Sequence, residues 1–107
     1  MTPEPTILDH LDRAALTDLC RRWQITEFSL FGSALRADFH ADSDVDVLIT
    51  FAESARYGFF ALSRLQEELE ELFGRTVDIV TRRTIERSRN RIRRESILGS
   101  LRPIYVA

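Results

Sequence analysis

The segment from Asp44 to Ile49 constrains the fold of this chain more than any other part of its sequence. It reads Asp-Val-Asp-Val-Leu-Ile, so two carboxylates alternate with apolar residues. On a β-strand, residues two positions apart point to the same face, which places Asp44 and Asp46 side by side. Neighbouring carboxylates repel each other unless a cation or a proton lies between them. The segment therefore predicts a strand that carries an acidic pair.

A Gly32-Ser33 pair stands ten residues ahead of Asp44. We interpret it as a turn before a short helix at 34–37, with backbone N–H groups that could receive a phosphate. An acidic pair suits a hard divalent cation such as Mg²⁺, which prefers oxygen ligands and leaves positions open for phosphates. The turn and the carboxylates together predict chemistry on a nucleoside triphosphate.

A third carboxylate, Asp78, lies inside another predicted strand, between Val77 and Ile79. A buried unpaired charge is costly, so this carboxylate requires an explanation. If its strand lies beside Asp44 and Asp46, the three carboxylates could hold two divalent ions about 3.5–4 Å apart for in-line phosphoryl displacement. Asp44 and Asp46 would bind the ion on the triphosphate, and Asp46 and Asp78 would share the second. Asp78 could also accept the proton of an attacking hydroxyl.

The predicted nucleotide contacts come from the turn. Ser33 and the backbone around Gly32 would hold the β- and γ-phosphates, and Arg36 could add positive charge near the leaving pyrophosphate. Each element alone has an ordinary alternative, because an Asp-x-Asp pair in a strand is most often surface decoration and a Gly-Ser pair is often only a turn. The spacing and the third carboxylate together support the predicted site.

The length of 107 residues fits one domain with a single core, and 44% hydrophobic with 30% charged residues is typical of a globular chain. No apolar run approaches the roughly 18 residues of a membrane span, and the first residues lack a signal-peptide pattern, so we expect a cytoplasmic protein. The single cysteine, Cys20, excludes an internal disulfide and a cysteine-based zinc site.

The charge distribution is uneven although the net charge is only −2. All fifteen basic residues are arginines, which excludes P-loop and Schiff-base lysine chemistry. Eight of them fall between Arg82 and Arg102. This stretch is interpreted as a solvated helix face or as a docking surface for an acidic partner, and direct nucleic-acid binding is the least favoured interpretation.

Apolar spacing predicts two long helices, three strands and an arginine-rich helical stretch that precedes a short apolar end. Phe59, Phe60 and Tyr105 could serve an interface, although we expect them to pack in the core. We expect Gly74 to cap the second helix. The order fits a small α/β sheet with helices against one face, but the pairing order of the strands does not follow. The predicted ranges are 6–23 and 57–73 for the helices, 26–31, 44–51 and 76–81 for the strands, 82–102 for the basic stretch and 104–106 for the end. We divide the single domain, 1–107, into an N-terminal helix (1–24), a catalytic core (25–81) and an arginine-rich C-terminal helix and tail (82–107).

The segments 31–38, 42–49 and 77–80 resemble the minimal nucleotidyltransferases of the DNA polymerase β superfamily, and the tail at 94–105 is similar as well. The resemblance runs from about residue 25 to the C-terminus. Ala37 departs from the family pattern, which often has glycine there. The resemblance implies a palm fold in which helices pack on a small mixed β-sheet.

The resemblance also implies an activity and a partner. Similar proteins are commonly encoded as antitoxins beside a HEPN-domain toxin, a ribonuclease. The resemblance implies transfer of AMP from ATP to a hydroxyl of the toxin, usually on a tyrosine, and the acidic pair predicts Mg²⁺ as the cofactor. The chain is too small to form a separate acceptor domain, so the acceptor and part of its pocket are expected to come from the partner in a hetero-oligomer.

Two other functions stay open. A non-catalytic antitoxin could neutralise its toxin by binding alone, and then Asp44→Asn with Asp46→Asn would leave neutralisation intact. The retained acidic cluster argues against this, because carboxylates without metal would be destabilising. A transferase that acts on a small molecule or an RNA end would normally need an added substrate domain.

Overall fold

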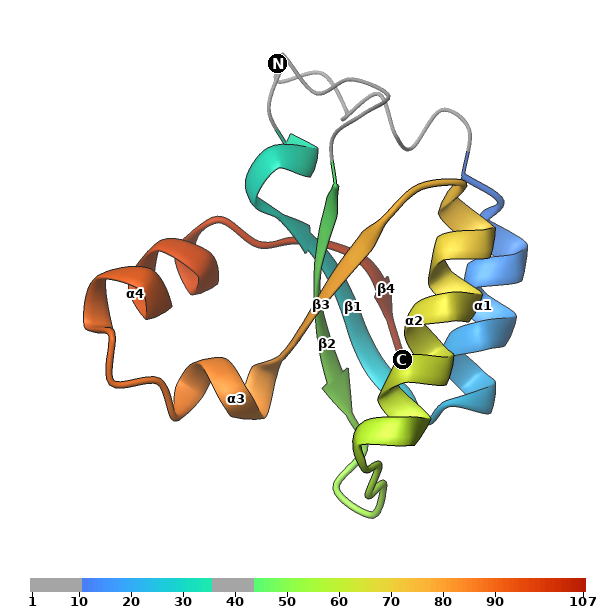
Figure 1. Cartoon of the computed structure of the whole chain (residues 1–107), viewed down its shortest axis with the longest axis horizontal. Helices are drawn as coiled ribbons and strands as arrows, with labels where there is room; N and C mark the ends of the chain where they lie inside the picture. The colour runs from blue at the N-terminus through green and yellow to red at the C-terminus, as the bar shows by residue number, and fades with distance from the viewer. Residues whose placement is uncertain (1–10, 36–43) are drawn as a thin grey trace.

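The computed structural model describes residues 11–35 and 44–107. They form a four-stranded sheet with helices on both faces (Figure 1). No helix in these two ranges is long and apolar enough to cross a membrane. The elements are α1 (Arg13–Arg22), β1 (Ile25–Phe31), the 3-10 helix η2 (Gly32–Leu35), β2 (Val45–Phe51), α2 (Phe59–Phe73), β3 (Val77–Thr81), α3 (Arg82–Glu86), α4 (Arg91–Gly99) and β4 (Arg102–Val106).

The strand order is β3-β2-β1-β4. β1 runs antiparallel to both of its neighbours, whereas β2 and β3 are parallel. Parallel neighbours need a crossover connection, and α2 provides it between β2 and β3. The mixed α/β fold class is thus confirmed. The strand order, which the sequence left open, places β3 and β4 at the two edges.

The first face of the sheet carries the main core. Val45, Val47 and Ile49 of β2 point toward α1 and α2, as their alternation predicts, and all three are fully buried. Figure 1 shows the two helices side by side over this face. Burial of each large apolar side chain contributes about 1.5–3 kcal/mol. The other buried members of this core are Leu16, Leu19, Cys20, Ile25, Phe28, Leu30, Leu65, Leu69 and Val77.

The predicted helix ends are partly confirmed. Asp12 caps α1 by accepting a hydrogen bond from the backbone N–H of Ala15 at 3.0 Å, so the helix begins later than the predicted residue 6. Residues 6–10 lie outside the described part of the chain. Gly74 ends α2 in the left-handed conformation with φ 71°, as predicted.

The second face of the sheet is covered by the arginine-rich stretch, which we did not expect. This stretch forms two helices, α3 and α4, capped by Thr81 and Asn90. Figure 1 shows the pair on the side of the sheet opposite α1 and α2. A second core cluster of Phe31, Leu48, Ile85 and Ile97 lies beneath them. The prediction of helices on one face was incomplete, because apolar residues in the basic stretch are sparse and indicate no particular partner.

Three aromatic side chains were expected in the core, and only Tyr105 packs against it. Phe59 and Phe60 are 78% and 86% exposed and contact each other edge to face. They lie in the first turn of α2, beyond the part of the helix that covers the sheet. Tyr105 belongs to β4, which pairs with β1 at a sheet edge and was predicted only as an apolar end. Pro103 argued against a strand in the sequence, although proline is tolerated in the edge strand of a sheet.

Candidate active site

Asp46 and Asp78 lie side by side on the second face of the sheet. Asp46 follows the first residue of β2, Asp78 follows the first residue of β3, and the two are register partners. On its other side Asp46 is opposite Phe31, the last residue of β1. Asp46 is half-buried and Asp78 is exposed. The condition that the strand of Asp78 lies beside the strand of Asp46, which the sequence left open, is therefore met.

The backbone of Gly32 passes directly over the Asp46 carboxylate. Gly32 has φ 65°, a conformation that side chains with a Cβ rarely adopt. A Cβ built at this position would lie 2.7 Å from Asp46 Oδ2. The glycine thus lets the turn at the end of β1 approach the carboxylate closely. A turn with short helical structure was predicted here, and the structure has η2, which begins at Gly32.

The other predicted site residues are placed only in part. Asp44 immediately precedes β2 and is exposed. Ser33 belongs to η2, but its side chain lies outside the description, and Arg36 falls within residues 36–43, which are also outside it. In the described ranges, no three His, Cys, Asp or Glu side chains are grouped closely enough to hold a metal ion. Metal binding by Asp44, Asp46 and Asp78 stays a prediction.

Residues 13–99 match the family model of the nucleotidyltransferase domain. The chain belongs to this family. The match spans every element from α1 to α4, including η2 and the strands that carry Asp46 and Asp78. The resemblance seen in the sequence is thereby confirmed.

Two archaeal relatives are named as protein adenylyltransferases. The chain is 35% identical over 69 residues to protein adenylyltransferase MntA of Thermococcus cleftensis, which covers 64% of this chain and 68% of that protein. It is 31% identical over 64 residues to a candidate protein adenylyltransferase of Methanocaldococcus jannaschii, covering 60% of this chain and 64% of the relative. The matched region thus spans about two thirds of the length of these relatives.

Solved structures share the fold. A candidate minimal nucleotidyltransferase superposes with a TM-score of 0.69 at 32% identity, covering 95% of this chain and 97% of the other. A toxin–antitoxin complex with AMP-PNP gives 0.68 at 18% identity, covering 91% and 75%. The MNT antitoxin in complex with a tri-AMPylated HEPN toxin of Shewanella oneidensis gives 0.59 at 18%, covering 89% and 70%. The last two likenesses concern the fold alone.

A different cluster lies at the opposite end of the second sheet face of this nucleotidyltransferase domain. Arg82 Nε donates to Thr50 Oγ1 at 3.0 Å, and Arg82 Nη2 lies 3.6 Å from Glu27 Oε2. Glu27 also accepts a hydrogen bond from the buried Ser29 hydroxyl at 3.3 Å. These contacts join α3 to the sheet. They were missed because they link residues that are far apart in the sequence.

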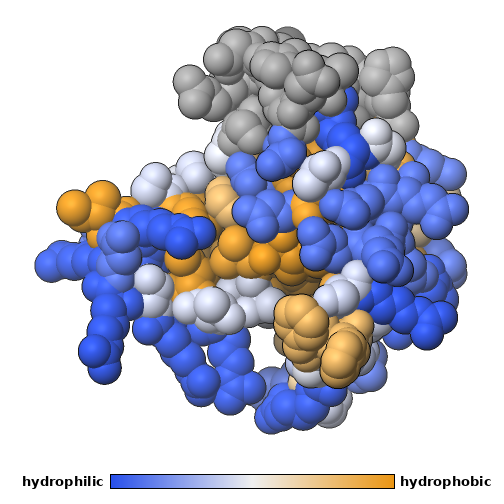
Figure 2. Space-filling view, viewed as in Figure 1, coloured by the Kyte–Doolittle hydropathy of each residue, from blue (hydrophilic) through white to orange (hydrophobic). Residues whose placement is uncertain are grey.

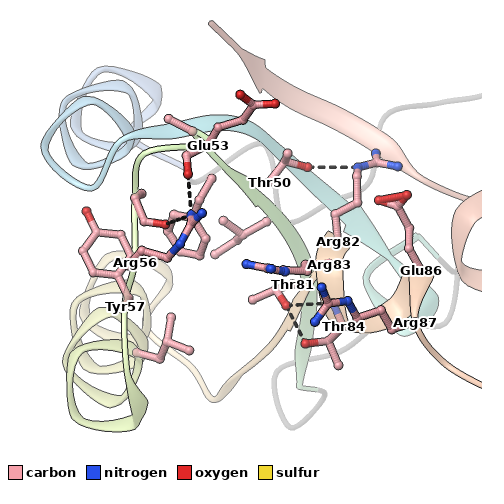
Figure 3. A pocket seen from close by; sticks show the side chains of 15 residues that line it. Thr50, Glu53, Arg56, Tyr57, Thr81, Arg82, Arg83, Thr84, Glu86 and Arg87 are labelled. Carbon is pink, nitrogen blue, oxygen red and sulfur yellow. Dashed lines mark hydrogen bonds between the residues drawn. The ribbon is translucent and has the colours of Figure 1, made fainter.

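A cleft of about 790 Å³ opens beside Arg82 (Figure 3). Figure 3 shows Arg83 and Arg87 extending from α3 into this cleft, opposite Arg56 of the β2–α2 loop. Arg56 donates to the backbone carbonyls of Glu53 and Ala55. The sequence indicated a basic stretch. It did not indicate that several of its arginines would lie around one cleft, because this arrangement depends on the break between α3 and α4.

A smaller groove of about 340 Å³ follows β3 and includes Asp78. Figure 2 shows apolar side chains at the surface here, between the polar surfaces of α2 and of α3 and α4. The lining residues Leu62, Thr81 and Thr84 are shared with the arginine-lined cleft, so the two hollows adjoin each other. The carboxylate face is therefore connected by a surface path to the arginines.

Cys20 takes no part in these surfaces. It is fully buried in the main core, and burial raises the pKa of its thiol to about 12. A reactive cysteine needs a lowered pKa and access to solvent. Cys20 is therefore a structural residue of α1.

Proposed function

We propose that this nucleotidyltransferase domain is an antitoxin that transfers AMP from ATP to a tyrosine hydroxyl of a HEPN-domain ribonuclease toxin. The observation that supports it most is the Asp46 carboxylate, in contact distance of the Gly32 turn and in register with Asp78. The names of the relatives and the fold shared with toxin–antitoxin complexes support the acceptor class.

The proposed reaction is a single displacement at the α-phosphorus of ATP. The acceptor oxygen forms a bond to this phosphorus, the bond to the oxygen that bridges to the β-phosphate breaks, and pyrophosphate leaves. The hydroxyl proton passes to the carboxylate of Asp78. Backbone N–H groups at Gly32 and Ser33 would hold the outer phosphates, and Arg36 would offset the charge of the leaving pyrophosphate.

Mg²⁺ is the cofactor of this proposal, with two ions as the expected number, and Asp44, Asp46 and Asp78 would hold it. Carboxylate oxygens are the ligands that this ion prefers, and the lack of a Cβ at Gly32 leaves space beside Asp46 Oδ2. When bound, the metal would neutralise triphosphate charge and lower the pKa of the acceptor hydroxyl. The chain's own carboxylates would position it.

A labelling assay tests the proposal. The purified protein, Mg²⁺ and lysate of its own cells are incubated with ATP that is labelled at the α-phosphate, in the cytoplasmic extract where we expect both proteins. We expect one labelled protein band, identified as a HEPN toxin, and no band with the Asp44→Asn/Asp46→Asn variant. Glu67→Gln/Glu71→Gln, which also removes two carboxylates, serves as the control because both residues are exposed on α2.

Other results would contradict the proposal in distinct ways. If no protein is labelled and the double aspartate variant still neutralises the toxin, the protein is an antitoxin that acts by binding alone. If the label appears in the RNA or small-molecule fraction and depends on Asp44 and Asp46, the domain is a transferase with a different acceptor.

A further inference from the structure

The outer edge of β3 offers a binding surface beside the carboxylates. β3 is an edge strand. Val45 N–H donates to the carbonyl oxygen of Thr76 at 2.9 Å, so the backbone of Thr76 faces β2. Successive residues of a strand direct their N–H and C=O groups to opposite sides, so those of Val77 and Ile79 point away from β2. Those of Val77 are used by α2, since Gln66 donates to its carbonyl and Glu70 accepts from its N–H. Those of Ile79 have no partner within the described ranges.

The groove along this edge changes character from one end to the other. It has the Asp78 carboxylate at one end and is lined by Phe59, Ile79 and Val80 and by one arginine, Arg93 of α4. At Thr81 and Thr84 it adjoins the arginine-lined cleft. From Asp78 to Thr81 the strand spans roughly 10 Å. An extended chain in the groove would thus reach from the proposed proton acceptor to the arginines.

The arginines at the far end are available for an anion. Arg56 and Arg82 are engaged by neighbouring groups, whereas Arg83 and Arg87 have no carboxylate partner among the described residues. Figure 3 shows both side chains in the cleft. The guanidinium group is planar and pairs with carboxylates in a bidentate manner. This end of the groove is therefore suited to acidic side chains.

We propose that the acceptor segment of the protein substrate binds in extended form along the outer edge of β3, with its hydroxyl beside Asp78 and acidic residues on Arg83 and Arg87. The proposal rests on the proposed function. It identifies the recognised substrate as a segment with Asp or Glu roughly four to six residues from the acceptor tyrosine. Pairing of the segment with the edge of β3 would use the N–H and C=O groups of Ile79, which have no partner among residues 11–35 and 44–107.

A polypeptide fits this groove better than a nucleic acid does. A nucleic acid carries a negative charge at every residue, and its phosphates would lie against Asp78 and along the apolar wall of Ile79 and Val80. A peptide can place apolar residues along this wall and acidic residues only at the arginines. The acidic, apolar and basic parts of the groove thus match a polypeptide, whose side chains can differ from one residue to the next.

Binding of synthetic peptides tests this without any catalytic step. Two fluorescent peptides about twelve residues long carry one tyrosine, with three glutamates in one and three glutamines in the other, roughly four to six residues from the tyrosine. Fluorescence anisotropy with the full chain should show at least about tenfold tighter binding of the acidic peptide. Arg83→Glu/Arg87→Glu should abolish the difference.

The control variant is Arg21→Glu/Arg64→Glu, which makes the same change of charge at exposed residues outside both hollows. It should keep the preference for the acidic peptide. Equal binding of the two peptides, or an equal loss in both variants, would overturn the proposal. Tighter binding of a single-stranded RNA oligomer that depends on Arg83 and Arg87 would also overturn it, and would assign the cleft to RNA.

Hydrogen exchange gives a second readout. The acidic peptide should slow exchange of the Ile79 amide, whereas an unchanged Ile79 amide would contradict binding at this edge. Phe59→Ala should weaken peptide binding several-fold, and Phe60→Ala should not, because only Phe59 lines the groove. If the peptides do not bind but the toxin is labelled, this inference is refuted and the proposed function is not. Peptide binding without any toxin labelling would refute the proposed function.

Discussion

At Gly32 a single hydrogen atom in place of a methyl group decides whether the Asp46 carboxylate can occupy its position. We predict that Gly32→Ala lowers transfer activity at least a hundredfold, because the added Cβ would lie 2.7 Å from Asp46 Oδ2. The positive φ adds a stability cost of about 1 kcal/mol. Gly99→Ala is the matched control, since its Cβ would have open space. Activity and thermal unfolding of the two variants check the prediction, and full activity in Gly32→Ala would contradict it.

Because of Cys20, the free energy of unfolding should depend on pH in the alkaline range. Burial raises its thiol pKa to about 12, from an ordinary value of 9.0. Between these values the unfolded chain has lost the proton and the folded chain retains it, so stability falls as pH rises, by about 1.4 kcal/mol per pH unit. Urea unfolding of wild type and Cys20→Ala should show this extra slope in the wild type only. Parallel pH curves would contradict the buried, neutral thiol.

Helices α1 and α2 are joined by a carboxylate between them. Glu68 of α2 accepts hydrogen bonds from Trp23 Nε1 at 2.6 Å and from Arg22 Nη1 at 3.1 Å. The contact with Glu68 raises the pKa of Arg22. We predict that Glu68→Ala destabilises the fold by about 1–2 kcal/mol, because the half-buried indole N–H loses its acceptor.

Thermal unfolding measures this effect. A loss of about 1–2 kcal/mol corresponds to a Tm lower by roughly 4–16 °C in a domain of this size. Glu67→Ala, next in sequence and exposed, should change Tm little. If the two variants unfold at the same temperature, the contacts of Glu68 do not join the helices.

Helices and strands with a strong local sequence pattern could be predicted, and those with a weak pattern could not. The strand that carries Asp46 was evident because the β-branched residues Val45, Val47 and Ile49 alternate with Asp44, Asp46 and Leu48. β4 was missed because it is short and contains Pro103. The division of the basic stretch into α3 and α4 was missed too, since Ile85, Ile92 and Ile97 fit one helix or two. In the structure Ile92 is 83% exposed, so it contributes nothing to the core.

The candidate site was predictable in its members but not in its arrangement. The carboxylates and the Gly-Ser turn could be recognised from residue type and spacing. The register that pairs Asp46 with Asp78 could not, because it depends on how α2 crosses over the sheet. The contacts of Arg82 with Thr50 and Glu27 likewise join three separate segments, and no local pattern indicates them.

At the scale of the whole molecule, the second face of the sheet has two chemically different ends. The carboxylates lie at one end, the arginines at the other, and the cluster of Leu48, Ile85 and Ile97 separates them. We expect substitutions at the two ends to affect different steps, the transfer reaction at one end and the binding of the acceptor at the other. Substitution at Asp46 should lower kcat, and Arg83→Glu/Arg87→Glu should raise KM for the acceptor and leave KM for ATP unchanged. Steady-state kinetics of both variants check this, and a raised KM for ATP in the arginine variant would contradict it.

The most direct measurement of the central claim is the intact mass of the purified partner toxin after incubation with ATP, Mg²⁺ and this protein. The proposed function predicts that the wild type adds the mass of at least one AMP unit to the toxin, and that Asp46→Asn adds none while it still folds. A gain of AMP mass that persists undiminished with Asp46→Asn would contradict the assignment of the Asp46 face as the catalytic site.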